Sequence, residues 1–114
     1  MIVASKLIQI IRNLDEKVCA VNEQITLANP QIKKGFLTTR LEINKILLSL
    51  TQIQIKLKKK QEKYKLVLLK NILTGICFLL LNYNAKRAMT AVELALSLKD
   101  FIKVLRKAVN SLKV

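Results

Sequence analysis

The stretch from Leu66 to Leu81 constrains the fold more than any other part of this sequence, because it is apolar on every side of a helix. It reads LVLLKNILTGICFLLL. An element of this kind must be covered by other helices or by lipid, since water on any face would leave a large hydrophobic area exposed. The rest of the chain, or a membrane, must therefore supply the cover.

The length of the stretch favours a helical bundle. The strictly apolar run 72–81 has ten residues, and extending it back to Leu66 gives sixteen and includes Lys70. A membrane-spanning helix needs about twenty. We therefore expect a central bundle helix, with its apolar centre at Leu73, Ile76, Leu79 and Leu80. Membrane insertion is the alternative, because the basic segments 58–65 and 86–87 flank the stretch as interfacial anchors do.

The composition fits one compact helical domain. The chain has 114 residues, of which 52% are hydrophobic and 25% are charged, with two Gly and one Pro. A chain of this size usually forms one domain, and the scarcity of helix breakers favours long regular elements over disorder. Lys and Arg number 21 against 7 Asp and Glu, a formal charge of +14. Self-repulsion of this size must be offset by burial or by a polyanionic partner, such as nucleic acid, an anionic lipid surface or an acidic protein.

A heptad pattern predicts the first helix over residues 3–28. Its apolar residues alternate steps of three and four, which directs one stripe of the helix toward a partner helix. The stripe comprises Ala4, Leu7, Ile11, Leu14, Val18, Val21, Ile25 and Ala28. Asn29-Pro30 ends this helix, because the residue before a proline avoids the helical conformation. The short turn should make the first two helices antiparallel neighbours.

The second helix is predicted over residues 31–60. Its apolar residues recur every seven positions with intermediate ones between them, at Phe36, Ile43, Ile46, Leu50, Ile53 and Leu57. From Leu48 to Lys58, apolar and polar residues also alternate with the period of two expected for a half-buried strand. An isolated strand would leave its backbone groups unpaired, so we predict a helix here as well.

A break is expected between the second helix and the end of the apolar stretch. One helix through both segments would be roughly 75 Å long, too long for a compact domain of this size. We expect the break near residues 58–63 or near Gly75. Gly75 could instead permit close packing of two helices. The third helix is predicted over residues 64–82, followed by a loop at 82–84, where the sequence is Asn-Tyr-Asn.

The last helix is predicted over residues 86–113, with its start open between Asn84 and Thr90. Thr90 and Glu93 have the spacing of a capping box. The three-four alternation comprises Ala91, Leu94, Leu98, Phe101, Leu105, Ala108 and Leu112. The fold class is therefore all-α, an antiparallel three- or four-helix bundle with coiled-coil-like heptad seams. The principal packing residues are expected to be Leu7, Ile11, Leu14, Val18, Val21, Ile43, Leu50, Leu57, Leu98, Phe101 and Leu105.

Residues for catalysis or metal binding are scarce. The chain has no His, and Cys19 and Cys77 are far apart and form no CxxC pair, which argues against acid–base, zinc or redox chemistry. The seven carboxylates are scattered among lysines, and no phosphate-binding loop or nucleophile motif is present. We expect a non-catalytic protein with no cofactor, metal or small-molecule substrate, in a reducing intracellular compartment.

The lysines define the candidate contact with polyanions. The candidates are Lys56, Lys58, Lys59, Lys60, Lys63 and Lys65, together with Lys103, Arg106 and Lys107 of the last helix. Such residues neutralise phosphates and give salt-dependent, sequence-indifferent binding to nucleic acid. The alternative is that they only keep a leucine-rich protein soluble.

The sequence predicts a non-catalytic structural or adaptor subunit of a larger assembly. It would pack through its heptad faces and contact an acidic partner through its basic surface, because broad apolar faces on so small a chain favour self-association or docking. The alternative is a small membrane-associated or membrane-inserted protein, anchored by residues 66–81 with lysine-rich flanks.

Overall fold

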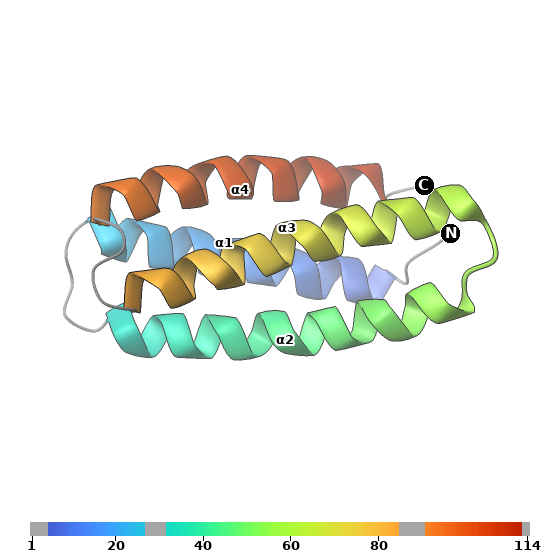
Figure 1. Cartoon of the computed structure of the whole chain (residues 1–114), viewed down its shortest axis with the longest axis horizontal. Coiled ribbons are helices and arrows are strands. Elements are labelled where there is room, and N and C mark those ends of the chain that lie inside the picture. Colours follow the sequence, from blue (N-terminus) through green and yellow to red (C-terminus); the bar gives the residue numbers. More distant parts are fainter. Residues whose placement is uncertain (1–4, 27–31, 85–90, 113–114) are drawn as a thin grey trace.

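Four helices pack side by side in the computed structural model, which describes residues 5–26, 32–84 and 91–112 (Figure 1). The helices are α1 (Ser5–Thr26), α2 (Ile32–Lys56), α3 (Lys60–Asn84) and α4 (Ala91–Ser111). Successive helices run in opposite directions along the long axis of a body of 44 × 22 × 20 Å (Figure 1). The predicted all-α helical bundle is thereby confirmed, with four helices.

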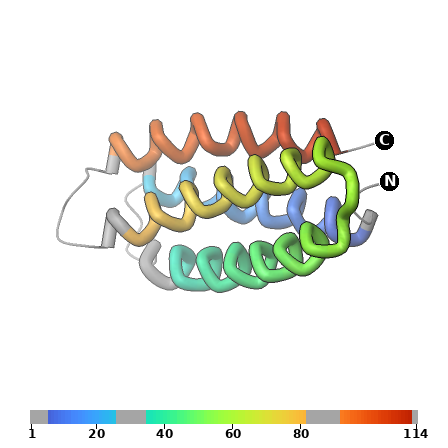
Figure 2. The backbone as a smooth tube through the Cα atoms, turned by 45° about the vertical axis from the view of Figure 1, so that its right-hand side comes forward, coloured from blue at the N-terminus to red at the C-terminus, as the bar shows by residue number. Residues whose placement is uncertain are grey.

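The helices form a ring of four. α1 packs against α2 and α4, and α3 packs against the same two helices. In Figure 2, α4 lies at the top and α2 at the bottom, with α3 in front of α1, so α1 and α3 lie across the ring from each other. Each helix therefore turns one face toward a shared core and the opposite face outward.

The core is filled by Leu, Ile and Val from all four helices. Of the predicted packing residues, those buried are Leu7, Ile11, Leu14, Val18, Val21, Ile43, Leu50, Leu98 and Leu105. Leu57 and Phe101 are half-buried and pack against this core. Ile8, Ile102 and Val109 are also buried. They lie beside the predicted stripes, because a helix in a four-membered ring packs against two neighbours and buries a face wider than a two-stranded seam.

The bundle covers only one side of the apolar stretch. The side chains of α3 buried in the core are Leu66, Leu69, Ile72, Leu73, Ile76 and Leu80. Leu79, expected at the apolar centre, is half-buried. Phe78 is 60% exposed and Leu81 is 43% exposed. The expectation that other helices would cover every side of this segment is therefore wrong.

The helix boundaries differ from the predicted ones around α3. The break lies at residues 57–59, so α2 ends earlier and α3 begins earlier than predicted, and α3 continues through Gly75. α3 also runs to Asn84, so the loop predicted at 82–84 is wrong. Asn disfavours a helix only weakly, and packing of the preceding Leu80 in the core outweighs that preference. The alternating segment before the break is helical through Lys56, so the strand alternative is wrong.

Several predicted features lie outside the described residues. They are the Asn29-Pro30 turn, the cap at Thr90, the basic pair at 86–87, and the stripe residues Ala4 and Ala28.

Candidate functional site

Exposed large hydrophobic side chains gather on α2 and α3, which are adjacent in the ring. Among the described residues these are Leu37, Leu41, Leu48, Ile55, Tyr64, Val67, Leu68, Phe78 and Leu81, which we call the outer apolar face. α1 and α4 together expose four, at Ile10, Val92, Leu96 and Val104. Apolar surface concentrated on neighbouring elements is a mark of an interaction site.

On α2 the outer apolar face lies opposite the core. Leu41 and Leu48 stand two positions before the buried residues Ile43 and Leu50. Two positions on an α-helix are about 200° apart, so one member of each pair points inward and the other outward. Leu37 has the same relation to Thr39, whose side chain is buried at 3% exposure. α2 is therefore apolar on two opposite faces.

On α3 the same relation holds for the aromatic residues. Tyr64 and Phe78 stand two positions before the buried residues Leu66 and Leu80. Tyr64 is 68% exposed and lies near the start of α3, whereas Phe78 lies near its end. The outer apolar face thus extends over both helices, from Ile55 and Tyr64 beside the α2–α3 connection to Leu37 and Leu81 toward the other end of the bundle.

Sequence reasoning missed the outer apolar face, although a signal for it is present. The alternation from Leu48 to Lys58 resembles a strand because a helix with apolar residues on opposite faces also places them two positions apart. Once the segment is known to be helical, the alternation indicates a second apolar face.

The α2–α3 connection forms a basic corner of five exposed lysines, Lys56, Lys58, Lys59, Lys60 and Lys63. The connection is short, and backbone hydrogen bonds hold both of its ends. The amide of Leu57 donates to the carbonyl of Gln54 at 3.3 Å, and the amide of Lys63 donates to the carbonyl of Lys59 at 3.2 Å. Lys56 complements the negative end of the α2 dipole, whereas the lysines at the start of α3 add to its positive end. Glu62 is the acidic residue of that first turn and is outnumbered by the five lysines. The corner therefore has a net positive charge and attracts anions.

Two other predicted polyanion contacts are engaged elsewhere. Lys65 is half-buried and its Nζ donates to the backbone carbonyl of Ser111 at 3.3 Å, which ties α3 to the end of α4. Arg106 is turned toward α1. Lys103 and Lys107 are exposed on the second half of α4, which ends at the same end of the bundle as the basic corner (Figure 1).

Asp15, Cys19 and Arg106 form a polar cluster between α1 and α4. Arg106 Nε lies 2.8 Å from Asp15 Oδ2, and its Nη2 lies 3.1 Å from Cys19 Sγ. The Cys19 thiol faces Asp15 Oδ1 at 3.9 Å. Burial and the Asp15 carboxylate raise the pKa of the Cys19 thiol above its ordinary value of 9.0, against the opposing effect of Arg106. The thiol is therefore neutral near pH 7 and poorly nucleophilic.

The same carboxylate raises the pKa of Arg106 through its hydrogen bond and its charge. An open hollow of about 600 Å³ beside the cluster is lined by apolar side chains of both helices, among them Ile25, Val92 and Leu96, and by polar ones, among them Glu23 and Lys99. The arrangement serves to join α1 to α4. It places no activated nucleophile in the hollow.

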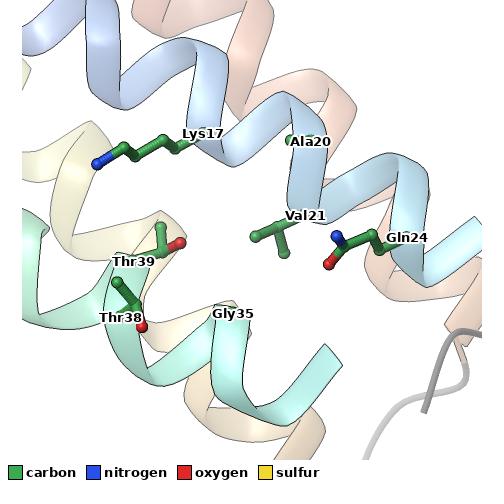
Figure 3. A pocket seen from close by; sticks show the side chains of 7 residues that line it. All are labelled: Lys17, Ala20, Val21, Gln24, Gly35, Thr38 and Thr39. Carbon is green, nitrogen blue, oxygen red and sulfur yellow. The ribbon is translucent and has the colours of Figure 1, made fainter. Parts of the chain in front are cut away.

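A smaller hollow of about 330 Å³ separates α1 from the first half of α2 (Figure 3). Val21 and Gln24 of α1 face Gly35 and Thr39 of α2 across it (Figure 3). A Cβ atom on Gly35 would lie 3.5 Å from Gln24 Oε1 and 3.6 Å from a Val21 methyl group, which is ordinary contact. The glycine is therefore not required by the packing of these two helices.

Gly75 permits close packing of α4 on α3, as the sequence suggested. A Cβ atom at this position would lie 2.5 Å from Cε1 of Phe101, well inside van der Waals contact. The ring of Phe101 therefore lies over the backbone of α3, and this predicted packing residue is half-buried.

The segment Lys60–Leu81 is long and apolar enough to cross a membrane by length and composition, and its apolar window of 18 residues has a mean hydropathy of 1.7. One-third of its apolar window, 33%, is buried in the bundle. Within residues 5–26, 32–84 and 91–112, no three His, Cys, Asp or Glu side chains are gathered in a way that would hold a metal ion. Comparison of the chain with protein-family models, curated proteins and solved structures finds no match.

Proposed function

We propose that this chain is a non-catalytic structural or adaptor subunit that docks onto an acidic partner in a larger assembly. The outer apolar face carries the proposal. It presents nine exposed large hydrophobic residues on two neighbouring helices, whereas water-facing helices of a monomer expose such residues singly. Covering this face would supply the affinity, and the basic corner would orient the partner by charge.

The internal part of the proposal concerns the heptad seams. The buried residues Leu7, Leu14 and Val21 of α1 follow the heptad step, and we propose that they pack as knobs into holes of α2 and α4. A rigid bundle of this kind would hold the outer apolar face and the basic corner in one fixed orientation. No reacting group is part of this function.

The test compares two pairs of exposed residues in a complex isolated from the native cell. Replacement of Leu48 and Phe78 by Gln should release the chain from the larger assembly, so that it elutes at the size of a free bundle. Replacement of Val92 and Leu96 by Gln is the matched control, because these residues are 68% and 59% exposed on α4, close to the 63% of Leu48 and the 60% of Phe78. Release of both variants to the same extent would contradict the proposal.

The contribution of the basic corner is measured with duplex DNA. Reversal of Lys58, Lys59 and Lys60 to Glu should weaken binding strongly and flatten its dependence on salt, because each phosphate contact contributes a slope of about 0.9 in log K against log salt. Reversal of three dispersed exposed lysines, Lys6, Lys45 and Lys99, is the control of equal net charge. Equal loss in both variants would assign any binding to overall charge alone.

A second candidate function is a membrane protein in which α3 spans the bilayer. The hydropathy of Lys60–Leu81 favours it. Spanning would destabilise the bundle, because insertion of α3 would remove Leu66, Leu73 and Leu80 from a packed core and open the ring. Membranes washed with high salt and then alkaline carbonate would retain a spanning helix, whereas a docked bundle would be released.

A further inference from the structure

The outer apolar face extends along the whole of α2 and α3. Leu41 lies in the first half of α2 and Ile55 is its penultimate residue, while Tyr64 and Phe78 lie near the two ends of α3. A protein partner usually buries a compact group of anchors at the centre of an interface. A planar fluid surface instead contacts an apolar face over its full length.

Three polar side chains between these apolar residues are already hydrogen-bonded, whereas Asn44, Lys45, Gln52 and Asn71 are exposed beside them. Segment 46–55 of α2 contains no charged residue, and segment 66–84 of α3 contains only Lys70. The Nζ atom of Lys70 donates to Oε1 of a glutamine of α2 at 3.2 Å. The hydroxyls of Thr51 and Thr74 donate to backbone carbonyls one turn earlier, at 2.9 and 2.8 Å. Covering these hydroxyls with an apolar phase therefore costs little.

The distribution of charge selects an anionic occupant. The carboxylate of Glu42 is turned toward α1, where it pairs with Lys17. The outer apolar face is bordered by the five lysines of the basic corner, with the half-buried Glu62 as the acidic residue of the adjoining turn. A second copy with the same formal charge of +14 would bring like charges together, which disfavours self-association through this face.

Tyr64 lies at the boundary between the two kinds of surface. It is 68% exposed, next to Lys63 in sequence and three positions before Val67. Tyr residues concentrate where an apolar phase meets water, and Lys side chains extend from that level to charged groups above it. On the exposed side of α3, Lys60 and Lys63 precede Tyr64, and Val67 and Leu68 follow it, as at the edge of a lipid-contacting surface.

We propose that the closed bundle lies flat on an anionic lipid bilayer, with α2 and α3 parallel to its plane. The outer apolar face would enter the boundary between headgroups and acyl chains, and the basic corner would contact the anionic headgroups. This inference rests on the proposed docking function and names its partner. An acidic protein helix fits less well, because such a helix binds in a groove, and the two hollows described above lie between α1 and α2 and between α1 and α4.

The test uses tryptophan as a depth probe, since the chain contains no Trp. Three single variants are made at exposed positions: Tyr64→Trp, Phe78→Trp and, as the control on α4, Val92→Trp. Each is mixed with phosphatidylcholine vesicles containing phosphatidylglycerol, and with vesicles of phosphatidylcholine alone. Emission maxima and quenching by lipids brominated at different depths are recorded.

The expected result is a blue shift of both α3 probes with anionic vesicles, no shift of the Val92→Trp probe, and affinity roughly tenfold or more weaker on neutral vesicles. The two α3 probes should be quenched at the same depth. They are fourteen positions apart, so a spanning α3 would separate them by roughly 21 Å along the helix. Unequal depths would overturn the flat orientation, and a shift of the α4 probe equal to that of the α3 probes would overturn the choice of face.

Failure of this inference is distinguishable from failure of the proposed function. Absence of any shift with anionic vesicles would overturn the lipid partner. Suppose that the lipid test fails but the Leu48→Gln, Phe78→Gln double variant is released from the native assembly and its α4 control is not. The outer apolar face would then be a protein-docking surface. If neither pair mattered, both the inference and the proposed function would be wrong.

Discussion

The α1–α4 side of the ring differs from the α2–α3 side although both pairs help to build the same core. α1 and α4 have charged outer faces, joined across their interface by the ion pair between Asp15 and Arg106. α2 and α3 have outer faces rich in exposed apolar residues, and a hydrogen bond between them joins Lys70 to the neutral acceptor Gln54. The outer surface of the α1–α4 side is suited to contact with water. The α2–α3 side resembles an element awaiting a further layer.

The comparison teaches that amphipathicity identifies the free side of a bundle. A helix that needs only one partner layer is apolar on one stripe, as α1 is with its exposed Lys6, Glu16 and Glu23. A helix that is apolar on two opposite faces can pack against two apolar surroundings, one on each side. The core explains only one of them.

The largest expected effect separates the two faces of α3. Leu73→Ala removes a fully buried side chain and should lower the free energy of unfolding by about 2–5 kcal/mol, whereas Phe78→Ala on the outer face should change it by less than about 0.5 kcal/mol. Urea unfolding followed by circular dichroism measures both. Similar losses would show that the outer apolar face is covered in solution by another molecule.

The next effect separates the two glycines. Gly75→Ala forces the Phe101 ring off the α3 backbone and should cost about 1 kcal/mol net of the gain in helix propensity. Gly35→Ala meets only ordinary contacts and should stabilise the bundle by up to about 1 kcal/mol. Thermal unfolding compares them. Restoration of Gly75→Ala by a second change, Phe101→Leu, would assign the loss to the ring, and a loss that persists would assign it elsewhere.

A smaller effect concerns the polar links of the two sides. A double-mutant cycle with Asp15→Asn and Arg106→Gln should give a coupling of about 0.5–1 kcal/mol that weakens in high salt, since Arg106 is largely exposed. The corresponding cycle with Gln54→Ala and Lys70→Met should give less and respond little to salt. The distinction between an ionic and a neutral interface fails if the two couplings have the same salt dependence.

The smallest effect is a pH dependence from Cys19. Its pKa is raised in the folded state, so above the ordinary value of 9.0 the unfolded chain loses the thiol proton first and the folded chain keeps it. Stability from this group is thus present below that pH and is lost as pH rises through the folded pKa. The difference in unfolding free energy between the wild type and Cys19→Ala should narrow accordingly above pH 9. If the difference in unfolding free energy does not change with pH, ionisation of the Cys19 thiol does not contribute to stability.

Much of the fold followed from the spacing of apolar residues. The stripes of α1 and α4 predicted helices because each has one apolar face, and the buried Leu14 and Leu98 lie on them. α3 was harder, because a helix apolar on all sides gives no direction to its core face. The loop at Asn82 was predicted from local preference alone, and packing of Leu80 overrode it.

The candidate site was predictable only where residues are close in sequence. The basic corner is nearly contiguous, so its lysines were found, although not that Lys65 would be tied to Ser111. The cluster of Asp15, Cys19 and Arg106 joins residues ninety-one positions apart at its extremes, and it depends on α4 packing against α1. Nothing in the local sequence of either helix encodes that adjacency.

That adjacency also sets an order of assembly during translation. Contacts between consecutive helices become available as each hairpin leaves the ribosome, but the ring closes only when α4 meets α1. At about 5–20 residues per second, the nascent three-helix intermediate persists on the order of seconds with one side of its core open. The buried residues that α4 brings, Leu94, Leu98 and Leu105, are missing for that interval. The nascent chain therefore exposes the most apolar surface just before α4 packs against α1 and α3, and a chaperone that shields apolar surface would act in that interval.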